Sequence, residues 1–329
     1  MKKKYDITTI PSLIDMHVHF REPGFEYKET IETGIQSAKA GGFSGVCTMP
    51  NTNPVCDNKK VIKEILQKAK KHHFEIYPIC AITKNLNSLE LVDFKELKKE
   101  GAIAFSNDGL PLLDKEVFLN ALKSEELIIS HCENESVEIA WQIEMFEKAL
   151  EEGFKPRLHF CHISKKESVD LIREAKRKGL TITAETAPHY FTFTKDDIDT
   201  TGTYKMNPQL GNEQDKRAIM DGLLDNTIDV IATDHAPHSN EEKLKPYLES
   251  PNGITGLETA FSLSLELLGL EKTLEKMAYN PRRILQINNK KMIKVALDET
   301  WVVAPSLFKS KCKISPYKGM KLKGIIINE

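Results

Sequence analysis

Several features that would place this chain in a common class of protein are missing from its sequence. No apolar run approaches the roughly 18 residues that a membrane-spanning helix needs. Lysine and arginine number 46 against 48 acidic residues, so no excess of positive charge points to nucleic acid. The basic residues 2–4 are not followed by an apolar core, so a signal peptide is not expected.

Cysteine pairs are missing as well, because the six cysteines include no Cys-X-X-Cys. Several of them lie inside apolar runs, where a free cysteine behaves as a small hydrophobic side chain. This usage indicates a reducing compartment, and we expect a cytoplasmic protein.

A nucleotide-binding fingerprint is also absent, since no Gly-X-Gly-X-X-Gly follows any strand-like run. The 329 residues instead alternate short apolar runs with amphipathic helical stretches. The expected strands lie at residues 10–14, 42–50, 74–82, 102–105, 127–131, 157–164, 180–187 and 228–234. The expected helices between strands lie at 61–71, 89–100, 115–123, 137–151 and 167–178.

Eight such units favour an α/β fold of the (β/α)₈ type, a TIM barrel, over an open doubly wound sheet. We assign this barrel to residues 1–290, with two further helices at 257–268 and 274–285. Short β-like runs at 293–297, 301–303 and 324–327 then predict a small, reduced β appendage over residues 291–329.

The stretch that carries most information is the strand end around His17 and His19. Side chains alternate faces along a strand, so these two imidazoles point the same way and could hold one metal ion. Arg21 continues the same alternation and would place a guanidinium beside the metal. Such an arrangement suits chemistry on an anionic substrate.

In a TIM barrel the active site lies at the carboxyl ends of the strands. The residues at those ends include four histidines and two aspartates that are far apart in sequence: His17, His19, Asp108, His131, His162 and Asp234. Six ligands are too many for one tetrahedral zinc ion that keeps an open position. They fit two ions, one held by His17 and His19 and one by His131 and His162, with a bridging carboxylate.

A hydroxide between two such ions would act as the nucleophile, since metal binding generates hydroxide at neutral pH. Asp234 then fits a ligand that also accepts the proton of the attacking water and passes it to the leaving nitrogen. We predict that Asp108 is the bridging carboxylate. Its strand, 101–105, contains no lysine that could be carboxylated to serve instead.

Together these motifs resemble bacterial dihydroorotases of the amidohydrolase superfamily, the cyclic amidase branch. The resemblance extends in order over almost the whole chain and rests on residues 15–24 (Asp-Met-His-Val-His-Phe-Arg-Glu-Pro-Gly), 48–54, 104–109, 131–133, 162–164, 232–238 and 253–259. It implies the reversible, zinc-dependent interconversion of L-dihydroorotate and N-carbamoyl-L-aspartate in pyrimidine biosynthesis. It also implies two divalent ions, with Zn²⁺ as the expected metal.

The resemblance assigns substrate contacts too. Arg21 and Asn51 match residues that hold the substrate carboxylate, joined by His238, and Asn207 matches a residue near the pyrimidine ring. The expected partner is a small-molecule substrate, with neither nucleic acid nor membrane. As an assembly, the resemblance implies a homodimer or association with aspartate transcarbamoylase.

Two alternatives stay open. Hydantoinase, dihydropyrimidinase and allantoinase share the barrel and the ring-opening chemistry, but they typically carry a carboxylated lysine on the fourth strand. A catalytically silent, dihydroorotase-like scaffold subunit would have lost metal ligands, whereas this sequence retains all six.

Four neighbouring side chains are not expected to be ligands. His159 precedes His162 by three residues and should face the other side of its strand, and His189 is expected in the core or behind the ligands. Strand alternation should likewise direct Cys132 and Cys161 away from the metals.

Overall fold

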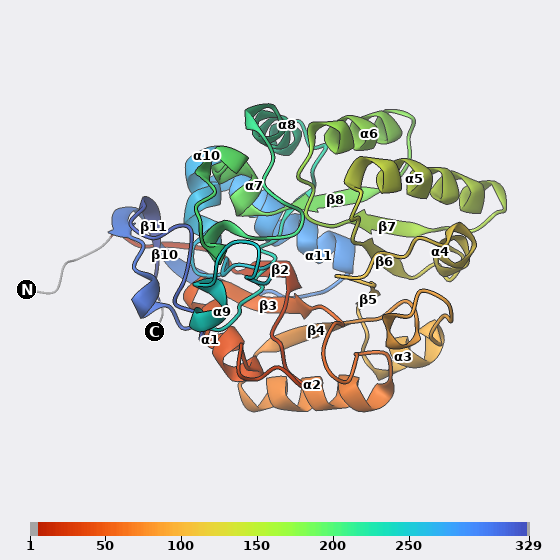
Figure 1. The fold of residues 1–329 in the computed structure, drawn as a ribbon, viewed down its shortest axis with the longest axis horizontal. Helices are drawn as coiled ribbons and strands as arrows, with labels where there is room; N and C mark the ends of the chain where they lie inside the picture. The colour runs from red at the N-terminus through yellow and green to blue at the C-terminus, as the bar shows by residue number, and fades with distance from the viewer. Residues whose placement is uncertain (1–5, 328–329) are drawn as a thin grey trace, which may run out of the picture.

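The computed structural model describes residues 6–327, and at its centre lies a sheet of eight parallel strands. The strands pair in the order in which they follow one another along the chain (Figure 1). They are β2 (Leu13–Val18), β3 (Phe43–Thr48), β4 (Glu75–Cys80), β5 (Ala104–Phe105), β6 (Leu127–Ser130), β7 (Arg157–Phe160), β8 (Thr183–Thr186) and β9 (Val230–Ile231).

The first and last strands approach each other. An isolated parallel bridge joins Val18 to His235, and the His19 amide donates to the His235 carbonyl at 2.8 Å. The sheet therefore nearly closes on itself, and the predicted TIM barrel is confirmed.

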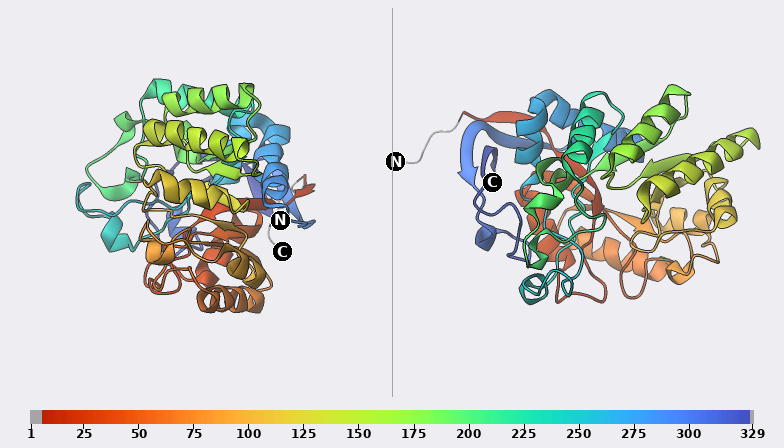
Figure 2. Two further views of the ribbon diagram at one scale, coloured as in Figure 1. Left: turned by 90° about the vertical axis from the view of Figure 1, so that its right-hand side faces the viewer. Right: turned by 45° about the horizontal axis from the view of Figure 1, so that its top comes forward.

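Helices follow the strands along the chain and cover the outside of the barrel (Figures 1 and 2). The longer ones are α1 (Ile31–Ala40), α2 (Lys59–Lys71), α3 (Phe94–Glu100), α4 (Lys115–Leu122), α5 (Glu135–Glu151), α6 (Lys166–Arg177), α8 (Glu213–Leu224) and α10 (Ala260–Leu274). Shorter ones are α7 (Pro188–Thr192), α9 (Asn240–Lys243) and α11 (Asn280–Leu285), the last preceded by a π-helical turn at Glu275–Tyr279. No helix among residues 6–327 is long and apolar enough to cross a membrane.

Local sequence explains where these helices begin and end. The Asn58 side chain accepts from two amides at the start of α2, whose buried face is apolar. The helix predicted over 89–100 is shorter than expected, because the Asp93 side chain caps α3 by accepting from the Glu96 amide. The same helix stops at Gly101, where a φ of 115° would strain any side chain. The predicted ranges did not include α1 or α8.

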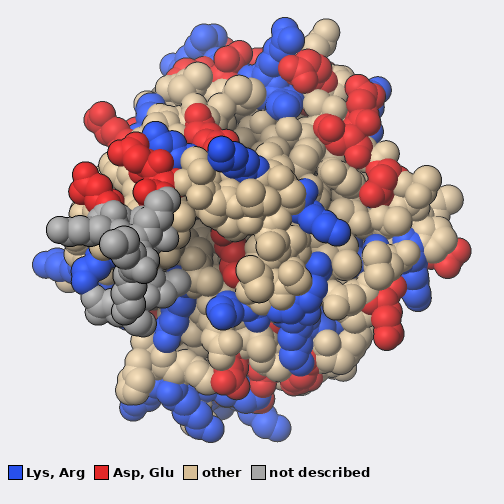
Figure 3. All heavy atoms as spheres, turned by 90° about the vertical axis from the view of Figure 1, so that its left-hand side faces the viewer, with Lys and Arg blue, Asp and Glu red and all other residues tan. Residues whose placement is uncertain are grey.

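Buried apolar side chains form two clusters. One consists of residues in the barrel strands or directly after them, such as Met16 and Ile129, together with Ile284 and Leu285 of α11, and it fills the barrel interior. The other combines strand and helix residues and lies between the two layers. Acidic and basic side chains are interspersed on the face of the molecule in Figure 3, as the balanced composition leads one to expect.

A second sheet has three antiparallel strands in the order β1-β10-β11: β1 (Thr8–Pro11), β10 (Met292–Val302) and β11 (Lys321–Ile327). The β-runs predicted at 293–297 and 301–303 both fall on a strand, but they are not separate, because β10 is continuous to Val302 and only its pairing register shifts between Ala296 and Thr300. Since β1 pairs with β10, the start of the described chain contributes to this small sheet. The domain division between residues 290 and 291 stays a prediction.

Candidate metal centre and substrate cavity

A cavity of about 200 Å³ lies at the carboxyl ends of the barrel strands. Its lining residues are His19, Arg21, Asn51, Asp108, Gly109, His131, His162, Asn207, Asp234, Ala236, Asn252 and Gly253. Eight of the ten residues predicted for the site are in this lining. The other two lie directly behind it, because His17 contacts Asp108 and Asp234, and His238 contacts Arg21.

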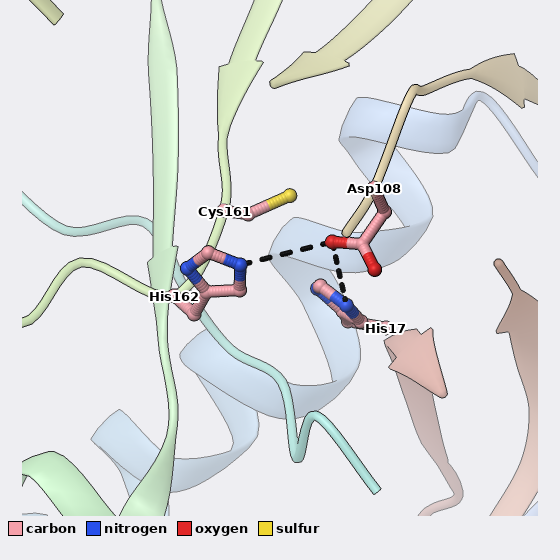
Figure 4. Close-up of side chains that lie close together, drawn as sticks. All are labelled: His17, Asp108, Cys161 and His162. Atoms are coloured by element: carbon pink, nitrogen blue, oxygen red, sulfur yellow. Dashed lines mark ion pairs between the residues drawn. The ribbon is translucent and has the colours of Figure 1, made fainter. Parts of the chain in front are cut away.

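The first histidine pair faces both aspartates. His17 Nε2 lies 3.3 Å from His19 Nε2 and 3.4 Å from Asp234 Oδ1, and His19 Nε2 lies 3.2 Å from that oxygen. His17 Nε2 is also 3.4 Å from Asp108 Oδ1 (Figure 4). Both imidazoles therefore direct the same kind of nitrogen at the space between two carboxylates.

The second pair shares Asp108 with the first. His131 Nδ1 and His162 Nε2 are 2.8 Å apart and lie 3.4 and 3.7 Å from Asp108 Oδ1. Asp108 is thus the one carboxylate within residues 6–327 that contacts both histidine pairs. This position is the one that a bridging ligand requires.

The donor set fits divalent metal ions. Imidazole nitrogens and carboxylate oxygens are typical zinc ligands, and several here converge within 4.8 Å of one another. Asp108 Oδ1, the oxygen that faces both histidine pairs, is buried and has no hydrogen-bond partner. Buried polar groups in native proteins are normally paired, so this unpaired oxygen is consistent with cation binding.

The cluster also sets the charge of its own carboxylates. Burial alone would raise the pKa of Asp108, but the His17, His131 and His162 side chains hold that pKa well below its usual range. Burial likewise opposes ionisation of Asp234, yet His17 and His19 lower the pKa of its carboxyl group. Both aspartates are therefore ionised at neutral pH.

Glu185, on β8, was missed by the sequence reasoning although it contacts a predicted ligand. Its Oε1 lies 2.8 Å from His17 Nδ1, and its Oε2 lies 3.1 Å from His159 Nε2. Burial opposes its ionisation, but His159 and His17 lower the pKa of Glu185 to about 2. A carboxylate behind a ligating histidine fixes the ring so that the other nitrogen faces the metal. An acidic residue inside a predicted buried strand was the signal that could have revealed it.

All four side chains that were not expected to be ligands lie outside the cavity lining. His159 is fully buried and contacts Glu185, so it lies behind the ligands. His189 is also fully buried, and burial lowers its pKa to about 4, which keeps the ring neutral. Cys132 contacts Ser130 and belongs to the cluster between strands and helices.

The predicted direction of the Cys161 side chain is wrong. Its sulfur lies within 4.8 Å of ligand atoms of His17, Asp108 and His162 (Figure 4). Alternation does not apply here because β7 ends at Phe160, and His162 has a φ of 31°, far from strand geometry. Burial raises the pKa of the Cys161 thiol, so as a protonated thiol it adds no charge to the cluster.

Comparison with known proteins gives this cluster its context. A family profile described as "Dihydro-orotase-like" matches residues 7–157. The chain is 40% identical to the dihydroorotase of Acetivibrio thermocellus, an alignment that covers 96% of this chain and 84% of that protein. It is also 40% identical to the dihydroorotase of Desulforapulum autotrophicum, over 97% of this chain and 84% of the relative.

The chain belongs to the dihydroorotase family. Members of this family are cyclic amide hydrolases. Solved structures show the same fold at lower sequence identity. L-Hydantoinase (dihydropyrimidinase) from Arthrobacter aurescens superposes with a TM-score of 0.82 at 22% identity, over 97% of this chain and 83% of that one. Dihydroorotase from Saccharomyces cerevisiae, in complex with 5-fluoroorotic acid, gives 0.79 at 15% identity over 98% of both chains.

In this family member, the imidazole–carboxylate cluster lies at one end of the cavity, and the residues predicted to contact substrate surround the other end. Asn51 Oδ1 accepts from His19 Nδ1 at 2.9 Å, which leaves His19 Nε2 free to face the aspartates. Arg21 does not follow strand alternation, since β2 ends at Val18 and Arg21 has a φ of 63°. Its Nε donates to the Pro237 carbonyl at 3.0 Å, which directs the guanidinium along the cavity wall.

Asn207 and His238 occupy different positions at the substrate-binding end of the cavity. Asn207 lines the cavity, and its amide nitrogen lies 3.5 Å from Glu133 Oε2. His238 lies behind Arg21, with its Nε2 3.2 Å from Arg21 Nη2 and 2.7 Å from the Asn252 carbonyl oxygen. His238 therefore contacts two lining residues without being part of the lining.

Proposed function

We propose that this enzyme interconverts L-dihydroorotate and N-carbamoyl-L-aspartate at the cavity described above. The single observation that carries the proposal is one cavity with a buried imidazole–carboxylate cluster at one end and Arg21 at the other. The cluster suits attack on a cyclic amide. Arg21 suits the carboxylate that distinguishes dihydroorotate from an uncharged ring.

Two divalent ions would be held by His17 and His19 on one side and by His131 and His162 on the other. Asp108 would bridge them, and Asp234 would complete the first site. When bound, such ions supply hydroxide at neutral pH and polarise the amide carbonyl. Zinc is the metal that a set of imidazoles and carboxylates suits best.

Asp234 is the proposed proton shuttle. It lines the cavity and is ionised at neutral pH, so it can accept the proton of the attacking water. In ring opening it then gives this proton to the leaving ring nitrogen, and in ring closure the transfer runs in reverse. The same carboxylate therefore serves both directions.

Arg21 and Asn51 would hold the substrate carboxylate, with His238 acting beside Arg21 and Asn207 near the ring. The planar guanidinium offers parallel N–H donors that match a carboxylate. Asn51 connects the two ends of the cavity, because its side chain contacts both His19 and Asp108. Substrate orientation would therefore be coupled to the position of the ligands.

Hydantoinase-type activity is less well supported. Among the residues that the structure describes, no lysine lines the cavity, and Lys98 lies on α3, where it donates to the Ile103 carbonyl and pairs with Glu126. A silent scaffold subunit is also disfavoured, since all six proposed ligands are present and gathered together.

The decisive experiment measures turnover of dihydroorotate, hydantoin and allantoin by the metal-loaded protein, with and without a chelator. We expect chelator-sensitive turnover of dihydroorotate well above that of the two other rings. Preferred turnover of hydantoin or allantoin, or dihydroorotate turnover that survives metal removal, would contradict the proposal. The cytoplasmic location and the assembly, as a homodimer or with aspartate transcarbamoylase, stay predictions that light scattering and localisation can test.

A further inference from the structure

Lys28, in the loop between β2 and α1, reaches the carboxylate-binding end of the cavity from behind. Its Nζ lies 2.9 Å from His238 Nδ1 and 3.4 Å from Glu242 Oε1. The side chain is only 15% exposed. The ammonium group is therefore held against one particular nitrogen of the imidazole.

The chemistry of this contact fixes the His238 tautomer. A lysine ammonium has three N–H donors and no acceptor, so His238 Nδ1 must offer its lone pair. The ring hydrogen then resides on Nε2. On the opposite side of the ring, Nε2 lies 2.7 Å from the Asn252 carbonyl oxygen, which can only accept. Two independent contacts thus require the same form, a neutral ring with hydrogen on Nε2.

In this tautomer, the contact between His238 and Arg21 is not a hydrogen bond. Arg21 Nη2 and His238 Nε2 are 3.2 Å apart, but both atoms then carry hydrogen and cannot form a hydrogen bond. Because Nε of Arg21 already donates to Pro237, the Nη hydrogens stay available on the side that lines the cavity. The loop at Asn252 and Gly253, which also lines the cavity, is held through the Nε2–H of His238.

Charged groups surround the ring closely. Among the residues that the structure describes, the cations facing it are Arg21, Lys28 and Lys243, and the carboxylate beside it is Glu242, whose Oε2 lies 3.8 Å from Nδ1. The Cys312 thiol lies against the His238 backbone. Burial first, and then Arg21 and Lys28, lower the pKa of His238 to about 2. The ring therefore stays neutral throughout the working pH range.

We propose that Lys28 is a positioning residue for the substrate carboxylate. It holds His238 in the neutral Nε2–H form, and His238 in turn orients the Asn252–Gly253 loop beside Arg21. This inference rests on the proposed function for its kinetic consequence. The tautomer itself can be measured without substrate.

Long-range ¹H–¹⁵N NMR correlations of histidine-labelled, metal-loaded protein test the tautomer directly, with the His238 signals assigned by their loss in His238→Gln. In the wild-type protein we expect a pyridine-like Nδ1 and a protonated Nε2 from pH 6 to 8. A protonated Nδ1 would overturn the proposal whether or not dihydroorotate is turned over. Absence of dihydroorotate turnover with the expected tautomer would instead refute only the proposed function.

Kinetics of Lys28→Met, Lys28→Arg and Lys59→Met then test the consequence. Lys28→Met should raise KM for dihydroorotate about tenfold at pH 8, with a much smaller change in kcat, because one charge-assisted contact is lost. Burial and Arg21 still keep the ring neutral in this variant, so the rise in KM should be the same at pH 6 and pH 8. Lys28→Arg retains a donor and should stay within about threefold of wild type.

Lys59→Met is the matched control, since the Lys59 side chain is 59% exposed and pairs with the exposed Glu96 on α3. It should leave KM unchanged at both pH values. A Lys28→Met variant with wild-type KM at pH 8, or with a defect that disappears at pH 6, would overturn the proposal. If that variant does not fold, the NMR measurement of the His238 tautomer in the wild-type protein still tests the proposal.

Discussion

The two ends of the cavity are built in opposite ways. At the metal end, two aspartates face four imidazoles, and the cluster needs positive charge to complete it. At the other end, Lys28 pairs with Glu242 beside the neutral His238, and the Arg21 guanidinium that lines the cavity can bind a negatively charged group. A substrate with an amide to be cleaved and a carboxylate nearby has only one orientation that satisfies both ends.

The ends also differ in the backbone that supports them. The metal-end residues lie at the carboxyl ends of barrel strands or within three residues after them: His17 is in β2, His131 directly follows β6, and Asp108 lies three residues after β5. The cationic end is formed by loops, which the buried Lys243 connects by donating to the carbonyls of Lys205 and Pro251, each at 3.1 Å. Changes at the metal end should therefore abolish chemistry, whereas changes at the cationic end should mainly weaken substrate binding.

The largest effect is expected from removing the proton shuttle at the metal end. Asp234→Ala should lower the rate of both directions by about a thousandfold or more, because general acid–base transfer is lost. In the wild-type enzyme, ring opening should decline at acidic pH as Asp234 becomes protonated, and closure should be favoured there. Steady-state assays in both directions across pH would measure this. Asp221→Ala, on the exposed side of α8, is the control, and wild-type activity of Asp234→Ala at every pH would require another base.

The next prediction concerns metal retention. Asp108→Ala should release at least one metal ion per chain, since Asp108 is the carboxylate that contacts both histidine pairs. Wild-type activity should not respond to added bicarbonate, and the intact mass should show no carbon dioxide adduct. Metal analysis by mass spectrometry and the mass of the native protein test these statements. A variant that retains both metals and full activity would refute the bridging role.

At the cationic end, Arg21→Met should reduce kcat/KM for dihydroorotate by about a hundredfold, because a bidentate charged contact is lost. Metal content and thermal stability should stay at the wild-type level, which separates this end from the metal end. Arg217→Met, with a side chain 74% exposed on α8, provides the control. Near-normal kinetics in Arg21→Met would remove Arg21 from the site.

The smallest effect concerns stability. Burial lowers the pKa of Lys243 from 10.5 to about 7, so above pH 7 the unfolded chain binds more protons than the folded one. The free energy of unfolding should therefore rise with pH relative to Lys243→Met, by about 2 kcal/mol between pH 7 and 9. Urea unfolding of both proteins at the two pH values measures this difference. A constant difference would mean that Lys243 stays charged in the fold.

The sequence by itself predicted the barrel and the gathering of the six proposed ligands. Alternating strands and helices dictate a parallel barrel, and a parallel barrel brings all carboxyl ends of its strands to one mouth. The positions of His17, Asp108 and His131 at those ends were therefore sufficient to place them together. The local sequence pattern is enough for this prediction, because which strand ends come together depends only on the direction of the strands.

The tertiary structure alone decided the positions of side chains that lie just beyond the ends of the regular strands. Cys161 turned towards the cluster because β7 ends one residue earlier, and Arg21 reached the cavity through a left-handed φ instead of strand alternation. The contacts of Glu185 with His17 and of Lys28 with His238 join residues 168 and 210 positions apart. No periodicity in the sequence encodes such contacts, since they depend on how loops and strand ends pack in three dimensions.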